Sequence, residues 1–231
     1  MAEHLAERLV LSFTVGGVTI AFNLTTMLVS WVVIVLLVAL ALVLRRGLRQ
    51  EVEDKPNRIQ ATVDVIMDVL QSQLLAGFGS DRVARALFPF IGTIFLYVLF
   101  CNWIAIVPYL PSPTEDLNVT LSLGIMVLVM THGVAMRFRG VRHHLKGLIE
   151  PLPFLLPLHL MGDIGRTTSH SFRLFGNLYG GAILVAVFST SLVPLVVPVG
   201  LNLFFGLFVG LIQAFVFSML AVIYINTAVT E

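Results

Sequence analysis

The sequence predicts an all-α integral membrane protein with about five spanning helices, an amphipathic surface helix, and a long tilted hairpin formed by the last two spans. Hydrophobic residues make up 58% of the 231 residues and charged residues only 12%, whereas an average soluble domain carries roughly 25% charged residues. Several uncharged stretches also exceed the about 20 mostly apolar residues that cross a bilayer. Both observations indicate that lipid is the solvent for most of the surface.

The first uncharged stretch runs from Leu9 to Leu44. Its early part is rich in serine, threonine, asparagine and glycine, so we expect residues 1–25 to form an external N-terminal segment and residues 26–44 to form the first span. A cleaved signal peptide is not expected, because the stretch is too long for the apolar region of a signal and Glu3 and Glu7 precede it.

Apolar residues then recur at helical spacing over residues 58–80, with Asp64, Asp68 and Gln71 between them. This pattern favours an amphipathic helix on the membrane surface. A helix that packs against a soluble partner is the alternative.

The next two spans are predicted at residues 88–107 and 117–136. Prolines end the first of them, and the loop that follows carries Glu115 and Asp116. A basic loop follows the second, over residues 137–146. The last two spans are predicted at residues 150–190 and 195–229, because no charged residue occurs from Leu174 to Thr230.

The distribution of basic residues orients these spans. Clusters at residues 45–58 and 137–146 are basic and are expected in the cytoplasm, whereas the acidic loop at residues 108–116 is expected outside. The N-terminus is then outside and the C-terminus inside. We expect residues 1–231 to form a single membrane domain, since no stretch of useful size is left for a soluble one.

Most enzymatic chemistries have no signal in the sequence. It contains no glycine-rich phosphate loop, no histidine and cysteine set with metal-ligand spacing, and a single cysteine, Cys101, which excludes an intramolecular disulfide. We therefore expect no catalytic site, no metal, no cofactor and no nucleic-acid partner.

Arg173 is the exception, because apolar residues lie on both sides of a permanently charged group. A charge in mid-membrane costs about 2.5–3.5 kcal/mol on insertion scales and marks a functional site by default. An arginine that snorkels from a helix end is the alternative. Asn177 follows one helical turn later on the same face, and Gln213 is a lone polar residue in the last span, where a simple interhelical hydrogen bond would also explain it.

Four motifs, in order along the chain, resemble subunit a of the membrane sector of F-type ATP synthase. They are FIGTIFLY at residues 90–97, PTEDLNVTL at 113–121, SFRLFGNLYGG at 171–181 and IQAFVF at 212–217. The first 80 residues resemble the family only in pattern.

The resemblance implies a non-catalytic, ion-translocating stator subunit for ATP synthesis in the bacterial inner membrane. Such a subunit lies beside a ring of small hairpin subunits (c-type), each with one membrane carboxylate, and contacts peripheral-stalk b-type subunits. Arg173 matches the family's essential arginine, which separates two aqueous half-channels. Asn177 and Gln213 match the positions that flank it.

The sequence departs from the family at two positions. Many members carry a glutamate where Ala182 stands, and some carry a histidine where Gly206 stands. The half-channel candidates are the polar residues of the flanking segments: Asp163, His170, Glu115, Asp116, Asn118, Asn102 and His132.

Three functional alternatives stay open. The proton is the expected coupling ion, and sodium is the alternative. A stand-alone transporter would show inverted repeats, which we do not find. A non-conducting scaffold would give Arg173 no role.

Overall fold

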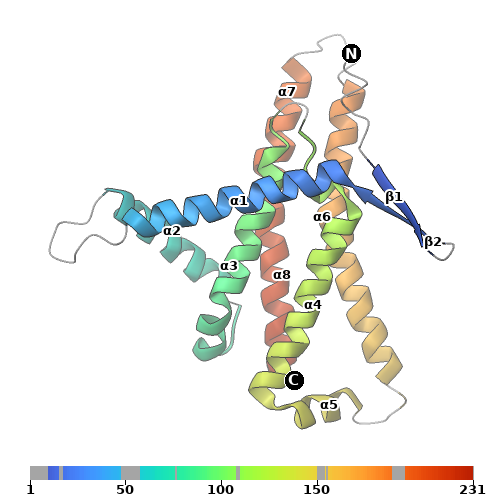
Figure 1. The fold of residues 1–231 in the computed structure, drawn as a ribbon. Coiled ribbons are helices and arrows are strands. Elements are labelled where there is room, and N and C mark those ends of the chain that lie inside the picture. Colours follow the sequence, from blue (N-terminus) through green and yellow to red (C-terminus); the bar gives the residue numbers. More distant parts are fainter. Residues whose placement is uncertain are drawn as a thin grey trace.

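The structure is a computed structural model that describes residues 10–15, 18–47, 58–75, 77–107, 110–149, 154, 156–188 and 196–230. Helices dominate it (Figure 1). Five of them are long and apolar enough to cross a membrane, which confirms the predicted all-α membrane body. A short antiparallel hairpin, β1 (Val10–Val15) and β2 (Val18–Asn23), precedes the helices and was not predicted.

Helix α1 (Leu24–Gly47) runs across the bundle of the later helices in Figure 1. Its large apolar side chains are mostly exposed; Trp31, for example, is 62% exposed. Because an apolar helix so little covered by protein is stable only in lipid, this helix fits a peripheral span. Helix α2 (Arg58–Leu75) covers most of the range predicted for the surface helix and ends five residues earlier.

Helices α3 (Asp81–Ile104) and α4 (Leu117–Arg139) form the centre of the bundle, with the short 3-10 helix η2 (Pro113–Glu115) between them. Helix α3 begins seven residues before the expected 88, because charged residues fill its first turns. The basic segment after α4 is not the predicted loop. It forms a short amphipathic helix, α5 (Val141–Ile149), after Gly140, whose φ of 89° ends α4.

The last two membrane helices are longer than a bilayer is thick. Helix α6 (Leu156–Phe188) has 33 residues, and the second arm comprises α7 (Val196–Leu203), the π-helix η4 (Phe204–Val209) and α8 (Gly210–Thr230). At about 1.5 Å per residue α6 is about 50 Å long, against about 30 Å of hydrocarbon core. A helix of this length fits within a bilayer when it is tilted. The sequence predicted a long tilted hairpin for these two spans. The turn expected at residues 189–198 lies mostly outside the described residues, and its last three residues are helical, because α7 begins at Val196.

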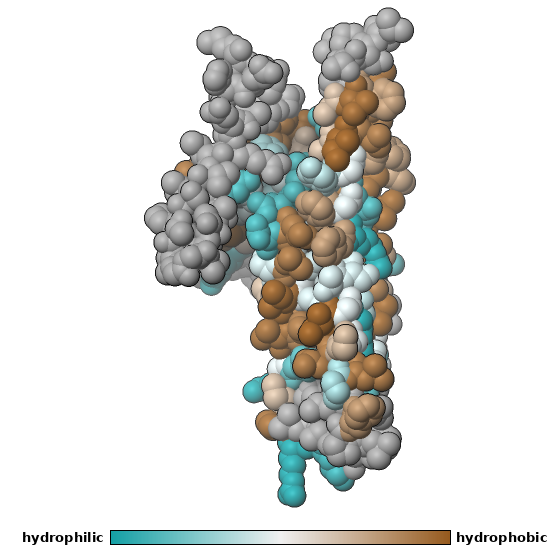
Figure 2. All heavy atoms as spheres, turned by 90° about the vertical axis from the view of Figure 1, so that its right-hand side faces the viewer, coloured by the Kyte–Doolittle hydropathy of each residue, from teal (hydrophilic) through white to brown (hydrophobic). Residues whose placement is uncertain are grey.

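Helix α8 packs on α3 and α4, and α4 packs on α6. The shared core is apolar and includes Ile91, Val98, Leu174 and Phe217. Glycines allow the closest approaches, since a Cβ at Gly206 would lie 2.6 Å from Ile106 Cγ1. Outside this core, Figure 2 shows apolar side chains over much of the surface, with hydrophilic ones between them. Among the polar residues of α6, His170 and Ser171 are buried in this packing.

Candidate functional site

Helix α6 carries its polar residues on one side. Asp163, His170 and Asn177 are seven residues apart, so two helical turns separate each from the next. His170 is buried together with Leu174 one turn later. Arg173 lies on the flank of this line and is exposed, as are Gly176 and Asn177. Of this line, His170 therefore faces the bundle, whereas Asn177 lies on the exposed side together with Arg173.

The Arg173 guanidinium has no hydrogen-bond or ion-pair partner within the part of the chain that the structure describes. No other charged residue occurs on α6 beyond it. Because an unpaired cation is costly in lipid, the guanidinium would be stabilised by water or by an anionic group that faces this side of α6.

Asn177 and Gln213, which the sequence analysis singled out together, are in direct contact. Asn177 Nδ2 donates to Gln213 Oε1 across 2.6 Å. Gln213 is only 4% exposed, so this hydrogen bond fixes its amide. The bond joins α6 to α8 one turn from Arg173 and limits the positions that the arginine side of α6 can take.

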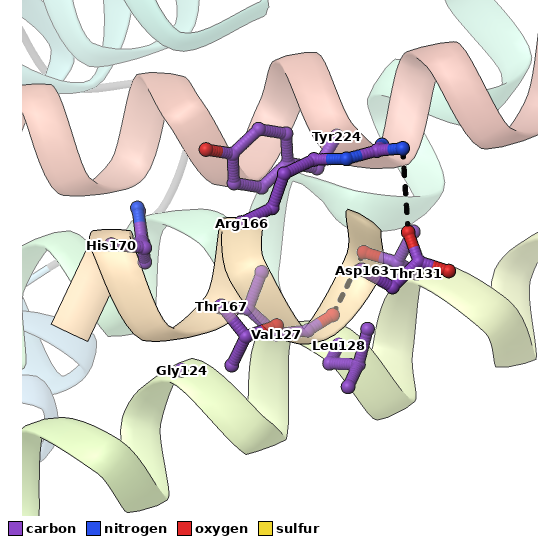
Figure 3. Close-up of a pocket in the computed structure, with 9 residues that line it drawn as sticks. All are labelled: Gly124, Val127, Leu128, Thr131, Asp163, Arg166, Thr167, His170 and Tyr224. Atoms are coloured by element: carbon purple, nitrogen blue, oxygen red, sulfur yellow. Dashed lines mark hydrogen bonds and ion pairs between the residues drawn. The ribbon is translucent and has the colours of Figure 1, made fainter. Parts of the chain in front are cut away.

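A small pocket lies between α4, α6 and α8, and we call it the α6 pocket (Figure 3). The volume within which the centre of a water molecule can lie is about 20 Å³. This is room for at least one water. At one end Asp163 pairs with Arg166 at 3.5 Å, and with His132 Nε2 at 3.4 Å. It is lined by Gly124, Val127, Leu128, Thr131, Asp163, Arg166, Thr167, His170 and Tyr224.

His170 lies at the other end of the α6 pocket. Its ring stacks on Phe217 with the centroids 3.8 Å apart and meets Tyr224 edge-on at 5.7 Å. The side chain is 2% exposed, yet its Nε2 has no hydrogen-bond partner within the described residues. A buried polar atom of this kind needs water or a ligand to be satisfied.

A second polar group, which we call the η2 network, joins η2 to α3 and α8. Asn102 is fully buried; its Nδ2 donates to the Gly210 carbonyl at 2.9 Å and its Oδ1 accepts from Thr114 at 2.7 Å. The Ser112 hydroxyl lies 2.6 Å from that of Thr114 and donates to the Cys101 carbonyl at 2.7 Å. The network fixes the loop before α4 against the start of α8.

The η2 network ends at the surface in a second small pocket, of about 10 Å³ on the same measure. Glu115 and Asp116 lie at this pocket, while Asn118 hydrogen-bonds to Asp116 through its side-chain amide at 3.0 Å. Asp116 also caps α4 by accepting from the Asn118 backbone N–H. The pocket is lined by Asn23, Thr25, Thr26, Pro111, Ser112, Glu115 and Asp116.

The structure thus divides the predicted site residues into three groups. Asp163, His132 and His170 gather at the α6 pocket, Arg173 lies beside the Asn177–Gln213 pair, and Asn102, Glu115, Asp116 and Asn118 belong to the η2 side. Sequence reasoning missed several further residues of these groups. They are Arg166, Thr131 and Tyr224 in the α6 pocket, and Ser112 and Thr114 in the η2 network.

Helix α6 and η4 approach closely beyond Arg173. A Cβ on Gly181 would lie 2.8 Å from the ring of Phe205. Ala182 and Gly206, the next residues along each helix, carry no titratable group.

Five apolar helices long enough to span a membrane, with two small polar pockets between elements of the bundle, define a multi-pass membrane protein. Comparison with known proteins identifies the family. The model of the family described as ATP synthase A chain matches residues 27–226, and the chain belongs to this family.

Relatives from several bacteria agree with this assignment. The chain is 36% identical over 200 residues to ATP synthase subunit a 1 of Crocosphaera subtropica, with 87% of this chain and 84% of that protein covered. It is 36% identical over 206 residues to ATP synthase subunit a 1 of Syntrophotalea carbinolica, with the same coverage. It is 33% identical over 210 residues to ATP synthase subunit a of Desulforamulus reducens, with 87% and 78% covered.

Proposed function

We propose that this chain is the ion-translocating stator subunit of a rotary ATP synthase and that Arg173 separates its two half-channels. The observation that carries the proposal is the unpaired, exposed guanidinium on α6 in a member of the ATP synthase subunit a family. The role is ion transport coupled to ATP synthesis. It is non-catalytic, because the chemistry of ATP belongs to other subunits of the complex.

The charge of Arg173 explains how ion flow is coupled to rotation. A permanent cation favours the ionised form of a nearby carboxylate, so each ring carboxylate that comes to face Arg173 gives up its proton. The same cation repels a proton that moves directly from one half-channel to the other. Ions must then travel on the ring, and the Asn177–Gln213 pair positions the helix that carries the arginine.

The α6 pocket supplies the cytoplasmic half-channel in this proposal, with Asp163, His132 and His170 as its titratable groups. The surface pocket beside η2 supplies the mouth of the outer half-channel, with Glu115, Asp116 and Asn118, while Asn102 belongs to the buried network that holds this region in place. The orientation rests on Arg137 and Arg139 at the end of α4. It places the N-terminus outside and the C-terminus in the cytoplasm of a bacterium.

The ring would pack on the exposed side of α6. Beside Arg173 a Cβ on Gly176 or Gly180 would meet nothing within 4 Å, so another helix can approach closely there. Peripheral-stalk b-type subunits and lipid would cover other parts of the surface. The proton is the expected ion, since imidazole and carboxylate groups exchange protons and line the α6 pocket.

The test is Arg173→Ala in the complete ATP synthase complex, reconstituted in vesicles, with ATP-driven acidification of the vesicles measured by a pH-sensitive dye. We expect pumping to fall at least about tenfold, because a tenfold change corresponds to about 1.4 kcal/mol and the lost charge is worth more. Arg142→Ala, which removes an exposed arginine of α5, is the control and should leave pumping unchanged.

Normal pumping by Arg173→Ala would contradict the proposal. Transport activity of the purified chain without other subunits would favour a stand-alone transporter instead.

A further inference from the structure

Two buried side-chain nitrogens have no hydrogen-bond partner within the described residues, Trp103 Nε1 and His170 Nε2, and only His170 lines a pocket. The imidazole lies between Phe217 and Tyr224 and is 2% exposed. Burial of a hydrogen-bonding nitrogen without a partner is unfavourable. Either the ring is held there only by packing, or the nitrogen binds something that enters the α6 pocket.

The α6 pocket provides the space for such a molecule. It admits at least one water, and it runs along α6 from Asp163 to His170, about 10 Å along the helix axis. In Figure 3 the hydroxyl end of Tyr224 points toward His170, while Asp163 and Arg166 lie at the opposite end. Thr131 lies at the Asp163 end, and its hydroxyl donates to the Val127 carbonyl at 2.8 Å, so its oxygen can accept a hydrogen bond from water.

We propose that the α6 pocket is a water-binding site and that His170 relays protons between this water and the Arg173 side of α6. The inference rests on the proposed function and deepens it, because it names one relay residue and the proton as the ion in this half-channel. His170 lies one helical turn before Arg173, so it is the titratable group of the pocket nearest to the arginine along the helix.

The step moves one proton. A proton released on the Arg173 side reaches the neutral imidazole as hydronium and is transferred to the ring nitrogen that holds the lone pair, which leaves water and an imidazolium. The imidazolium then gives a proton to the water of the α6 pocket and becomes neutral again. The pocket water passes it to the carboxylate of Asp163, which releases it to water on the cytoplasmic side and is ionised again, so that one proton has moved and no group is consumed.

The surrounding charges favour a short-lived imidazolium. Arg173 and Arg166 on α6 repel it, and Asp163 on the same helix attracts the proton onward. From α4, His132 is paired with Asp163. From α8, Tyr224 offers a hydroxyl that can bind the same water. A side chain that relays a proton must release it readily. Repulsion from the arginines and attraction toward the carboxylate both favour that release.

The experiment measures passive proton conduction through the complete complex after its soluble ATPase sector has been stripped from the vesicles, with a potassium diffusion potential as the driving force. We expect His170→Gln and His170→Phe to assemble and to lower conduction at least about fivefold. Phenylalanine keeps an aromatic ring against Phe217 and Tyr224, so a packing role alone predicts normal conduction in His170→Phe. Ser169→Ala, an exposed neighbour on α6, is the matched control.

Thr131→Val provides a second test that leaves the imidazole in place. The change is nearly isosteric and removes an acceptor from the pocket, and we expect conduction to fall about two- to threefold. Unchanged conduction in Thr131→Val and in the assembled His170 variants would overturn the inference. If Arg173→Ala still abolished pumping in the same vesicles, the proposed function would stand without the relay. Uptake of radioactive sodium by the wild type without proton conduction would also overturn the relay.

Discussion

The two polar regions of this bundle are built from different chemical groups. The α6 pocket is lined by a histidine, a carboxylate, an arginine and a tyrosine, which are His170, Asp163, Arg166 and Tyr224, and a second histidine, His132, pairs with the carboxylate. The interior of the η2 network contains an amide and two hydroxyl groups, and the carboxylates nearby, Glu115 and Asp116, lie at the surface pocket. Titratable groups therefore lie inside one region and at the rim of the other.

The number of hydroxyl hydrogens limits how the η2 network can form its hydrogen bonds. Three oxygen–oxygen contacts, from Cys101 through Ser112 and Thr114 to Asn102, are 2.6–2.7 Å long, but the two hydroxyl groups supply only two hydrogens. The hydrogens can rearrange between these contacts. The Asn102 amide ends the chain, because it does not release a proton under ordinary conditions, so the network is better suited to holding helices in place than to conducting.

The comparison predicts its largest effect at Asp163, the carboxylate of the α6 pocket. In Asp163→Asn the carboxylate that attracts protons in the cytoplasmic half-channel is lost, together with its contacts to Arg166 and His132. We expect ATP-driven pumping to fall about tenfold, because an amide cannot take up and release the proton. The measurement is the initial rate of vesicle acidification per assembled complex.

Asp68→Asn is the matched control for this prediction, since Asp68 is an exposed carboxylate of α2. It should pump at the wild-type rate. An Asp163→Asn complex that pumps within about twofold of wild type would show that the α6 pocket is not on the ion path, and the contrast between the two regions would then have no functional meaning.

Asn102 is expected to matter for stability rather than for conduction. Asn102→Leu keeps the volume but removes the hydrogen bonds of the amide with the Gly210 carbonyl and the Thr114 hydroxyl. Each lost hydrogen bond costs about 0.5–1.5 kcal/mol, so the detergent-solubilised complex should lose this subunit at lower temperature. The test is to heat the solubilised wild-type and variant complexes and to measure, at each temperature, the fraction of this subunit that stays in the complex.

Complexes of Asn102→Leu that survive should pump within about twofold of wild type. A large loss of pumping with unchanged thermal stability would place the η2 network on the ion path as a conducting element, and the contrast would have to be redrawn.

Much of this fold could be read from the sequence because the membrane imposes a simple rule of length and apolarity. The long uncharged stretch after Leu174 predicted two helices, and both are present. The same rule misplaced the start of α3, since charged residues can occupy the first turns of a membrane helix that project into water, and it read α5 as a loop. The β1–β2 hairpin depends on pairing between two short segments, which hydrophobic length does not reveal.

The candidate site could be predicted residue by residue but not as groups. Arg173 and Gln213 stand out because polar residues are rare in apolar spans. The partnership of Asn102 with Thr114, and of Asp163 with His132, is set by how α3 and α4 pack against η2 and α6. Tyr224 went unselected because a tyrosine near a helix end is ordinary at a membrane interface, and only its position opposite His170 gives it a candidate role.

The smallest predicted effect concerns how tightly α4 closes the α6 pocket. A Cβ on Gly124 would contact the Ser171 hydroxyl and lie 3.2 Å from Thr167 Cγ2. Ser171 must then rotate away from the Thr167 carbonyl, to which it now donates at 3.0 Å, or α4 must move outward.

Losing that hydrogen bond would cost about 0.5–1.5 kcal/mol, so Gly124→Ala should assemble and pump about two- to threefold more slowly. Gly133→Ala on the same helix is the control, because a Cβ there meets nothing within 4 Å. If both variants pumped equally, the exact width of the pocket would not limit proton transfer. His170 and Asp163 would then act through a water chain that tolerates a shift of α4, as expected for mobile water rather than for direct contact between the two side chains.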